Sequence, residues 1–319
     1  MAALAIGSTP IPLDDVMRGL TGRGDAAATI RVVRAPAVLL AALAGAWIAC
    51  AGAAMQSVLR NPLADPYLLG VSGGAAIGAG AIVAIAPQAP RWLLPFVAFA
   101  GAIGASSLLL FFASRLPGGL RSRGATYTLI LSGVIFNAFA GALILLLHVL
   151  LSPARSQELL FWLMGAIQPG RASGGGWVAC FALGALGAAI LCARAPALNL
   201  LALGDDQAAA LGADPGRTRR DVVIGVSLSV AAAVAFTGLI GFVGLVVPHL
   251  VRLRVGADAR RVLPLSMLAG ALFLMLADAL ARALFPVAQT SIPVGAVTAF
   301  AGVPLFFVVF ARHLRGGNA

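Results

Sequence analysis

The chemistry open to this chain is limited first by the reactive residues that it has. All 22 of its basic side chains are arginine, and none of the 319 residues is a lysine. A phosphate-binding loop of the G-x-x-x-x-G-K-[ST] type needs a lysine, and Schiff-base catalysis needs a lysine amine. The sequence therefore predicts neither activity, and any ATP hydrolysis that drives this protein must take place on another polypeptide.

The other reactive side chains are too scattered to form a catalytic or metal centre. The chain has three histidines, one glutamate and three cysteines, with no C-x-x-C pair. Cys50, Cys180 and Cys192 fall inside apolar runs, where a thiol acts as a small apolar side chain. We expect no covalent catalysis, no metal ion and no cofactor bound by this chain itself. If ATP drives the function of this protein, ATP and Mg²⁺ would bind to another polypeptide, an ATPase.

One carboxylate lies inside an apolar run and has two interpretations. Asp278 precedes Arg282 by four residues, so the two side chains would share one face of a helix. A carboxylate in a membrane-spanning segment indicates either a proton relay or a structural charge that a neighbour compensates.

A second group of polar residues falls near the expected outer ends of apolar runs. His148 and Met164 could ligate haem iron in passing, although a single histidine at this depth also serves as an interfacial anchor. Arg155 and Arg171 flank the same segment and could attract propionates or an anionic siderophore.

Membrane-spanning helices must position all of these groups. The chain is 61% hydrophobic and 10% charged, with a mean hydropathy of +0.99, which is too little charge to cover a soluble domain. Apolar stretches of about 20 residues recur along its length. The sequence predicts one all-α, polytopic membrane domain over residues 1–319, without a cleavable signal peptide. Nine spans are expected at 36–58, 67–86, 92–114, 126–150, 174–193, 221–237, 239–253, 262–284 and 292–312.

The arginines predict which side of the membrane each connection faces. Fourteen of the 22 fall in alternate gaps or the adjoining span ends, and the side richer in arginine is expected to be cytoplasmic. Because the arginines are dispersed in this way, they do not indicate nucleic-acid binding. Nine spans leave the N-terminus outside, so residues 1–35 are either an outer tail or the remnant of a missing first span, and we favour the remnant. The cytoplasmic gaps are 59–66, 115–125, 194–220, 254–261 and 313–319.

Two segments on the predicted cytoplasmic side carry further meaning. In 197–214, Asp205 or Asp206 can cap a short helix that contains Gln207 to Leu211, and Gly212 can end it. Leu211 gives this helix an apolar face, which would dock into a groove on a soluble partner or lie on the membrane surface. In 59–70, two prolines fix a turn between spans.

The seventh span is interrupted by Gly241, Gly244 and Pro248. Such a segment is expected only where protein or a cavity covers the backbone. His249 follows on the cytoplasmic side and is expected to shape an inner gate or an ATPase contact.

Five motifs in order resemble those of the FecCD-type permease family, the membrane subunits of type II ABC importers for iron–siderophores, haem and cobalamin. They extend the resemblance over residues 31 to about 312. The motifs are RNPLADPYLLGVSGGAA from Arg60, FWLMG from Phe161, LNLLALGDDQAAALG from Leu198, GFVGLVVPHLVR from Gly241 and ADALAR from Ala277.

The resemblance implies ten spans per subunit, a dimer of two copies with the pathway at their interface, two ATP-binding subunits and a periplasmic substrate-binding protein. It implies that a helix at 205–213, with Asp205, Asp206, Gln207, Leu211 and Gly212, couples to the ATPase. Outer arginines would dock the binding protein, and by position these are Arg31, Arg34 and Arg282, although Val32-Val33 replaces the usual Leu-Pro. The expected pathway and gate residues are Asn61, Pro62, Gly73, Gly74, His148, Met164, Arg171, Gly241, Gly244, Pro248 and His249.

The resulting prediction is a permease of a binding-protein-dependent importer in the bacterial inner membrane, carrying haem or a ferric siderophore. Haem is slightly preferred, because several arginines and His148 lie near the expected outer mouth. A cobalamin permease of the same family and an ion-coupled secondary transporter are the alternatives. The second alternative is disfavoured because Asp278 is the only clear intramembrane carboxylate. A membrane-embedded enzyme would need a metal cluster or a nucleophile constellation that the sequence does not supply.

Overall fold

The computed structural model describes residues 2–5, 11–24, 26–115, 119–121, 125–168, 176–285, 290 and 292–316, and the regular structure within these ranges is helical throughout. The all-α prediction is therefore confirmed. The helices are α1 (Ala2–Ala5), α2 (Leu13–Leu20), η1 (Thr29–Arg34), α3 (Ala35–Leu59), η2 (Pro66–Leu69), α4 (Val71–Ile85), α5 (Leu93–Arg115), η3 (Gly119–Arg121), α6 (Ala125–Leu150), α7 (Pro153–Leu163), α8 (Gly176–Ala193), α9 (Ala195–Leu203), α10 (Asp205–Ala210), α11 (Pro215–Thr237), α12 (Val243–Val255), α13 (Ala259–Ala283) and α15 (Val294–Gly316).

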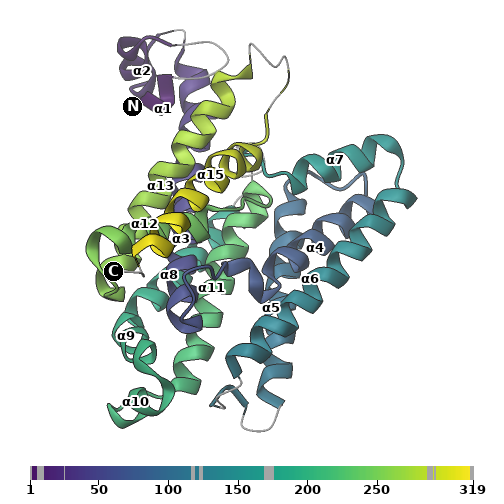
Figure 1. The fold of residues 1–319 in the computed structure, drawn as a ribbon. Coiled ribbons are helices and arrows are strands. Elements are labelled where there is room, and N and C mark those ends of the chain that lie inside the picture. Colours follow the sequence, from purple (N-terminus) through teal and green to yellow (C-terminus); the bar gives the residue numbers. More distant parts are fainter. Residues whose placement is uncertain are drawn as a thin grey trace.

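The long helices form a bundle with two distinct ends. Figure 1 shows α10 at one end and α1 with α2 at the other. The bundle has two groups, one of α4, α5 and α6 and the other of α3, α12 and α13, and α11 packs against both. This central position explains why α11 is 78% buried over its most apolar window, whereas α6 is 17% buried there. Since α6 presents large apolar side chains, it must face lipid or another protein.

Each of the nine predicted spans contains a helix, but they differ in length. Within the described residues, five helices are long and apolar enough to cross a membrane, and α8 with α9 makes a sixth if the bent pair, with an angle of 51°, is one span. Two of the other segments, 67–86 and 239–253, are shortened by backbone breaks. The predicted 67–86 span is interrupted at Gly70, whose φ of 72° ends η2 before α4 begins. In the same way, α12 begins only at Val243, because residues 238–242 are not helical.

Small residues allow the helices to approach closely. A Cβ atom added at Gly45 would meet the backbone of Gly270, which joins α3 to α13. A Cβ atom at Gly52 would lie 1.8 Å from the carbonyl oxygen of Gly244, which joins α3 to α12. Such contacts are the usual basis of helix association in lipid, where apolar side chains gain nothing by leaving the hydrocarbon.

Short N-terminal helices lie at the end of the bundle opposite α10 (Figure 1). Val16 of α2 and Leu4 of α1 pack with Ile30 in a small apolar cluster at the start of the first long span. Residues 1–35 were expected to form an outer tail or the remnant of a span, and their described part lies at the predicted outer end.

Candidate functional site

The loops at the α10 end are those that the arginine distribution assigned to one side. Asp214 caps α11 by accepting a hydrogen bond from the amide of Arg217, and Asp258 caps α13 through the amide of Arg260. We call this end, made by α9, α10, η3 and the adjacent ends of α3, α11 and α13, the basic end.

Asp205 is the centre of the basic end. Its two carboxylate oxygens contact different arginines, Arg60 at 2.7 Å and Arg219 at 2.6 Å. Arg60 is the residue that follows α3, and Arg219 belongs to the first turns of α11. One carboxylate on α10 therefore joins the ends of two of the most buried helices.

Both arginines also donate to backbone carbonyls. Arg60 Nε donates to the carbonyl oxygen of Leu201 in α9 at 2.8 Å, and Arg219 Nη1 donates to that of Leu120 in η3 at 3.0 Å. Only 2% of the Arg219 side chain is exposed, so its charge depends on Asp205 for compensation.

The charge balance at Asp205 favours its ionised form. Burial by itself raises the pKa of this carboxyl, but the hydrogen bonds and positive charges of Arg219 and Arg60 outweigh burial and lower the pKa below its usual value. At neutral pH Asp205 is thus a carboxylate that can hold both arginines.

A second connection fixes α9 to α13. Asn199 donates through Nδ2 to Asp258 Oδ1 at 2.6 Å and accepts through Oδ1 from the amide of Ala259 at 2.7 Å. The hydrogen bond from Asn199 is the main reason why the pKa of Asp258 is lowered. The α9–α10 segment is therefore attached to α3, α11 and α13 by side chains.

The predicted ATPase-coupling residues divide into two groups. Asp205 and Asp206 were expected to cap the helix, but the N-cap is Gly204, and both aspartates belong to the first turn of α10. The cap prediction is wrong because Asp205 is drawn inward to the two arginines. Gln207, Leu211 and Gly212 are exposed, Leu211 by 60%, and Gly212 ends the segment with a φ of 87° as predicted.

The glycines of the predicted pathway serve close packing in this structure. A Cβ atom at Gly73 would meet Asn137 of α6, whose Oδ1 accepts from the Gly73 amide at 3.2 Å, and one at Gly74 would meet Gly101 of α5. Gly244 lies against Pro66 as well as α3. A role of these positions in a pathway stays a prediction.

The remaining gate residues lie in turns and in α12. Asn61 and Pro62 are exposed, and Asn61 Oδ1 accepts from the amide of Leu63 at 2.9 Å. Gly241 lies in the non-helical stretch before α12, and a Cβ atom added there would meet nothing within 4 Å. Pro248 is buried inside α12 and His249 follows it, half-buried.

Sequence reasoning did not identify Tyr67 as a connector. Its hydroxyl donates to the carbonyl oxygen of Ile240 at 3.0 Å and accepts from the Ile240 amide at 3.2 Å, so it satisfies both backbone groups of one residue in the break before α12. Arg60, Asn199 and Arg219 were also missed as contacts. The only signal for these residues was a polar side chain within or next to an otherwise apolar motif.

The arginines predicted to dock a binding protein differ in accessibility. Arg31 is exposed, whereas Arg34 is buried and donates to the carbonyl oxygens of Leu4 and Ala5 at 2.8 and 3.0 Å. Arg282 pairs with Asp278 at 2.6 Å, so the expected i,i+4 compensation is present.

The predicted haem-ligating residues lie near α7. The ring of His148, in the last turn of α6, hydrogen-bonds with the hydroxyl of Ser156. Met164 follows α7 and is 47% exposed. Arg171 lies outside the described residues. Haem ligation at His148 stays a prediction, and its ring already has a protein partner.

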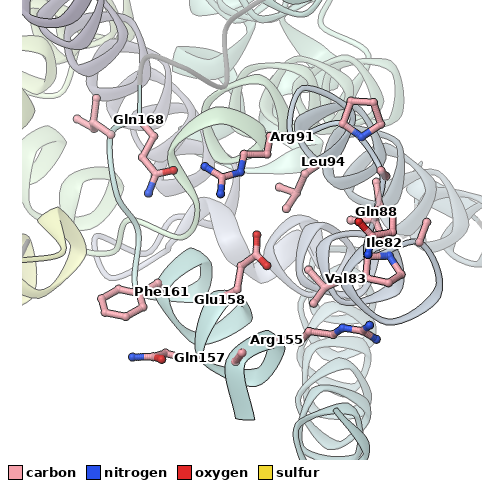
Figure 2. Close-up of a pocket in the computed structure, with 16 residues that line it drawn as sticks. Ile82, Val83, Gln88, Arg91, Leu94, Arg155, Gln157, Glu158, Phe161 and Gln168 are labelled. Atoms are coloured by element: carbon pink, nitrogen blue, oxygen red, sulfur yellow. The ribbon is translucent and has the colours of Figure 1, made fainter. Parts of the chain in front are cut away.

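A cavity of about 1120 Å³ opens between α7 and the turn that joins α4 to α5. Figure 2 shows Glu158 extending from α7 and Arg91 from the facing turn toward the space between them. Arg155 and Gln157 of α7 also line this cavity.

A family model for the FecCD transport family matches residues 1–312 of this sequence. The chain belongs to the FecCD transport family. It is 39% identical to the cobalamin import permease BtuC of Halobacterium salinarum over 90% of this chain and 74% of that protein. It is 38% identical to the hemin transport permease HmuU of Yersinia pestis over 88% of this chain and 82% of that protein.

A solved structure extends this FecCD likeness to the fold. A putative metal-chelate type ABC transporter in an inward-facing conformation matches with a TM-score of 0.79 and 30% identity, over 97% of this chain and 94% of that one. This FecCD chain is thus a multi-pass permease of a family that imports metal chelates, and its role is transport.

Proposed function

We propose that this chain is the permease subunit of a binding-protein-dependent ABC importer in the bacterial inner membrane. It carries a bulky metal chelate, either an iron complex or a corrinoid. Two copies would form the pathway between them, two ATP-binding subunits would bind the basic end, and a periplasmic binding protein would deliver the ligand to the opposite end. ATP and Mg²⁺ would bind only to the ATPase.

The observation that carries the proposal is the attachment of α9–α10 to three spans through Asp205 and Asn199. A helix without such connections could move when a partner binds its exposed face, but its movement would not be passed to the spans. Here a displacement of α10 by an ATPase would move α3 through Arg60 and α11 through Arg219. Because ATP binding and hydrolysis alter the ATPase, their free energy would shift the bundle between its two access states.

The relatives support a broad cargo class, because one is named as a cobalamin permease and another as a hemin permease. The preference for haem drawn from the sequence rested partly on His148, which contacts Ser156 in this structure. We therefore propose a metal chelate as the cargo class.

Reconstitution tests this function. The subunit is purified with the ATPase and binding protein encoded beside it, placed in liposomes, and assayed for uptake of haem, a ferric siderophore and cobalamin. ATP-dependent entry of one ligand is expected. Entry driven by a proton or sodium gradient without the ATPase would instead identify a secondary transporter.

A further inference from the structure

The cavity beside α7 concentrates polar chemistry that is scarce elsewhere in the chain. Glu158 is the only glutamate among the 319 residues, and three of the six glutamines also line the cavity. In a chain with 10% charged residues, this grouping makes the cavity unusually polar for this protein. The three glutamines are Gln88, Gln157 and Gln168.

Beneath this polar rim the cavity has an apolar wall. Ile82 and Val83 of α4 and Leu94 of α5 are buried residues that line it. Its volume of about 1120 Å³ lies just above the usual range for small-molecule sites, so a ligand larger than a typical drug would fit. An apolar wall under a polar rim suits a bulky chelate with an apolar body and polar edge groups.

The polar side chains of the cavity have hydrogen-bonding capacity to offer. Within the described part of the chain, no hydrogen bond or ion pair engages Arg91, Arg155 or Glu158, and none engages the three glutamines. Arginine only donates, an ionised glutamate only accepts, and each glutamine does both. The rim therefore presents donors and acceptors side by side.

This combination of donors and acceptors should favour amide-type groups of a ligand over carboxylate groups. An amide-type group, such as a carboxamide or a hydroxamate, can accept a hydrogen bond from Arg91 and can form hydrogen bonds with the glutamines. A carboxamide N–H can also donate to Glu158. A carboxylate has acceptors alone, so it would pair with an arginine but leave Glu158 unpaired and repelled. Figure 2 shows that Glu158 extends into the space that such a group would enter.

We propose that the cavity between α7 and the α4–α5 turn receives the edge of a neutral metal chelate that carries amide-type groups, and that Glu158 discriminates against carboxylate-bearing chelates there. This inference rests on the proposed import function and names its cargo class more narrowly. The site would act after the binding protein releases its ligand, at the predicted outer end of the permease.

The test uses the permease–ATPase complex in nanodiscs without the binding protein, because the binding protein would impose its own selectivity. Equilibrium binding is measured with four probes, two of them amide-type (cyanocobalamin and a ferric trihydroxamate) and two with carboxylates (haemin and ferric citrate). We expect at least one amide-type probe to bind at least about tenfold more tightly than both carboxylate probes.

The variants Glu158→Gln and Glu158→Lys then test how the charge of Glu158 affects the binding of each probe class. Glu158→Gln keeps an acceptor and is expected to leave binding of the amide-type probe within about twofold, while carboxylate binding tightens by about tenfold. Glu158→Lys is expected to invert the preference. Asp15→Asn removes an exposed carboxylate from α2, outside the cavity, and should leave the ratio unchanged.

Three results would overturn the inference: a wild-type preference for the carboxylate probes, an equal effect of Glu158→Gln on both classes, or no binding of any probe by a correctly assembled complex. The two proposals fail separately. If ATP-driven uptake occurs but does not depend on Glu158, the proposed import function stands and the proposed cavity site is wrong. If the probes bind in the expected pattern but no ATP-driven uptake occurs, the proposed import function is wrong and the proposed cavity site stands.

Discussion

The carboxylate of Asp205 lies 2.6 Å from the guanidinium of Arg219, a side chain that is only 2% exposed. The same carboxylate holds Arg60 at 2.7 Å with its other oxygen. The short α10 helix is therefore anchored on its inner side by charge, while Gln207 and Leu211 on its exposed side remain accessible to a partner. These two sides predict different mutant phenotypes.

Asp205→Asn is expected to weaken the connection between α10 and the spans. The buried Arg219 charge would lose its partner, at a cost on the order of 3 kcal/mol in stability. In the assembled importer, ligand uptake per ATP hydrolysed should fall several-fold, because α10 could move without α3 and α11. The measurement is a paired ATPase and uptake assay in liposomes.

A variant on the exposed side provides the comparison for that result. Leu211→Glu should lower the affinity for the ATPase while leaving the thermal stability of the isolated permease unchanged. If Asp205→Asn also affected only ATPase affinity, the anchoring role would be excluded.

The ion pairs of Asp205 should make stability fall in acid. The folded-state pKa is lowered relative to the unfolded chain, so this contribution is complete above the unfolded pKa and is lost as pH falls through the folded value. Thermal unfolding of the wild type and Asp205→Asn should therefore differ near pH 7 and converge below about pH 4. A difference that persists unchanged at pH 3 would show that the Asp205 charge is not responsible.

Gly52→Ala should prevent α3 from packing against α12. The added Cβ atom would lie 1.8 Å from the Gly244 carbonyl oxygen, so the two backbones must separate. We expect loss of folded protein from the membrane fraction, measured by size-exclusion profile after mild solubilisation. Gly104→Ala is the matched control, because its Cβ atom would meet nothing within 4 Å. Normal yield of Gly52→Ala would contradict the packing.

The outer arginines should separate into docking and structural roles. Arg31→Glu is expected to weaken binding-protein affinity by about tenfold without a change in thermal stability, because Arg31 is exposed. Arg34→Glu should lower stability as well, since Arg34 is buried against the carbonyls of Leu4 and Ala5. Affinity is measured by surface plasmon resonance on nanodiscs. Unchanged docking by Arg31→Glu, Arg34→Glu and Arg282→Glu would exclude this surface.

Asp278→Asn distinguishes a proton relay from a structural charge. Asp278 pairs with Arg282 at 2.6 Å, and this compensation favours the structural role. We expect ATP-driven uptake to persist in the variant once assembly is verified. Abolished uptake by a fully assembled complex, with ATP hydrolysis intact, would instead support proton coupling.

The sequence by itself determined the helical segments, the grouping of the arginine-rich connections and the family. Hydrophobicity is a local property that sums along the chain, so the segments from 36–58 to 292–312 could be located without any contact. Glycine and proline also marked the interruption of the 239–253 segment, but the break at Gly70 inside the predicted 67–86 span was not predicted. A short helix containing Gln207 to Leu211 was predicted before Gly212, and the structure has one over Asp205–Ala210, which starts earlier than predicted.

Only the tertiary structure decided which polar groups meet. Asp205 and Arg60 are 145 residues apart, and their contact depends on the packing of α3 against α9 and α11. In the same way, Arg91 and Glu158 line one cavity, although their separation in the sequence gives no sign that they lie close together. A charge in a sequence indicates that a partner is needed, but helix packing and rotation select the partner, and these depend on every close contact in the bundle.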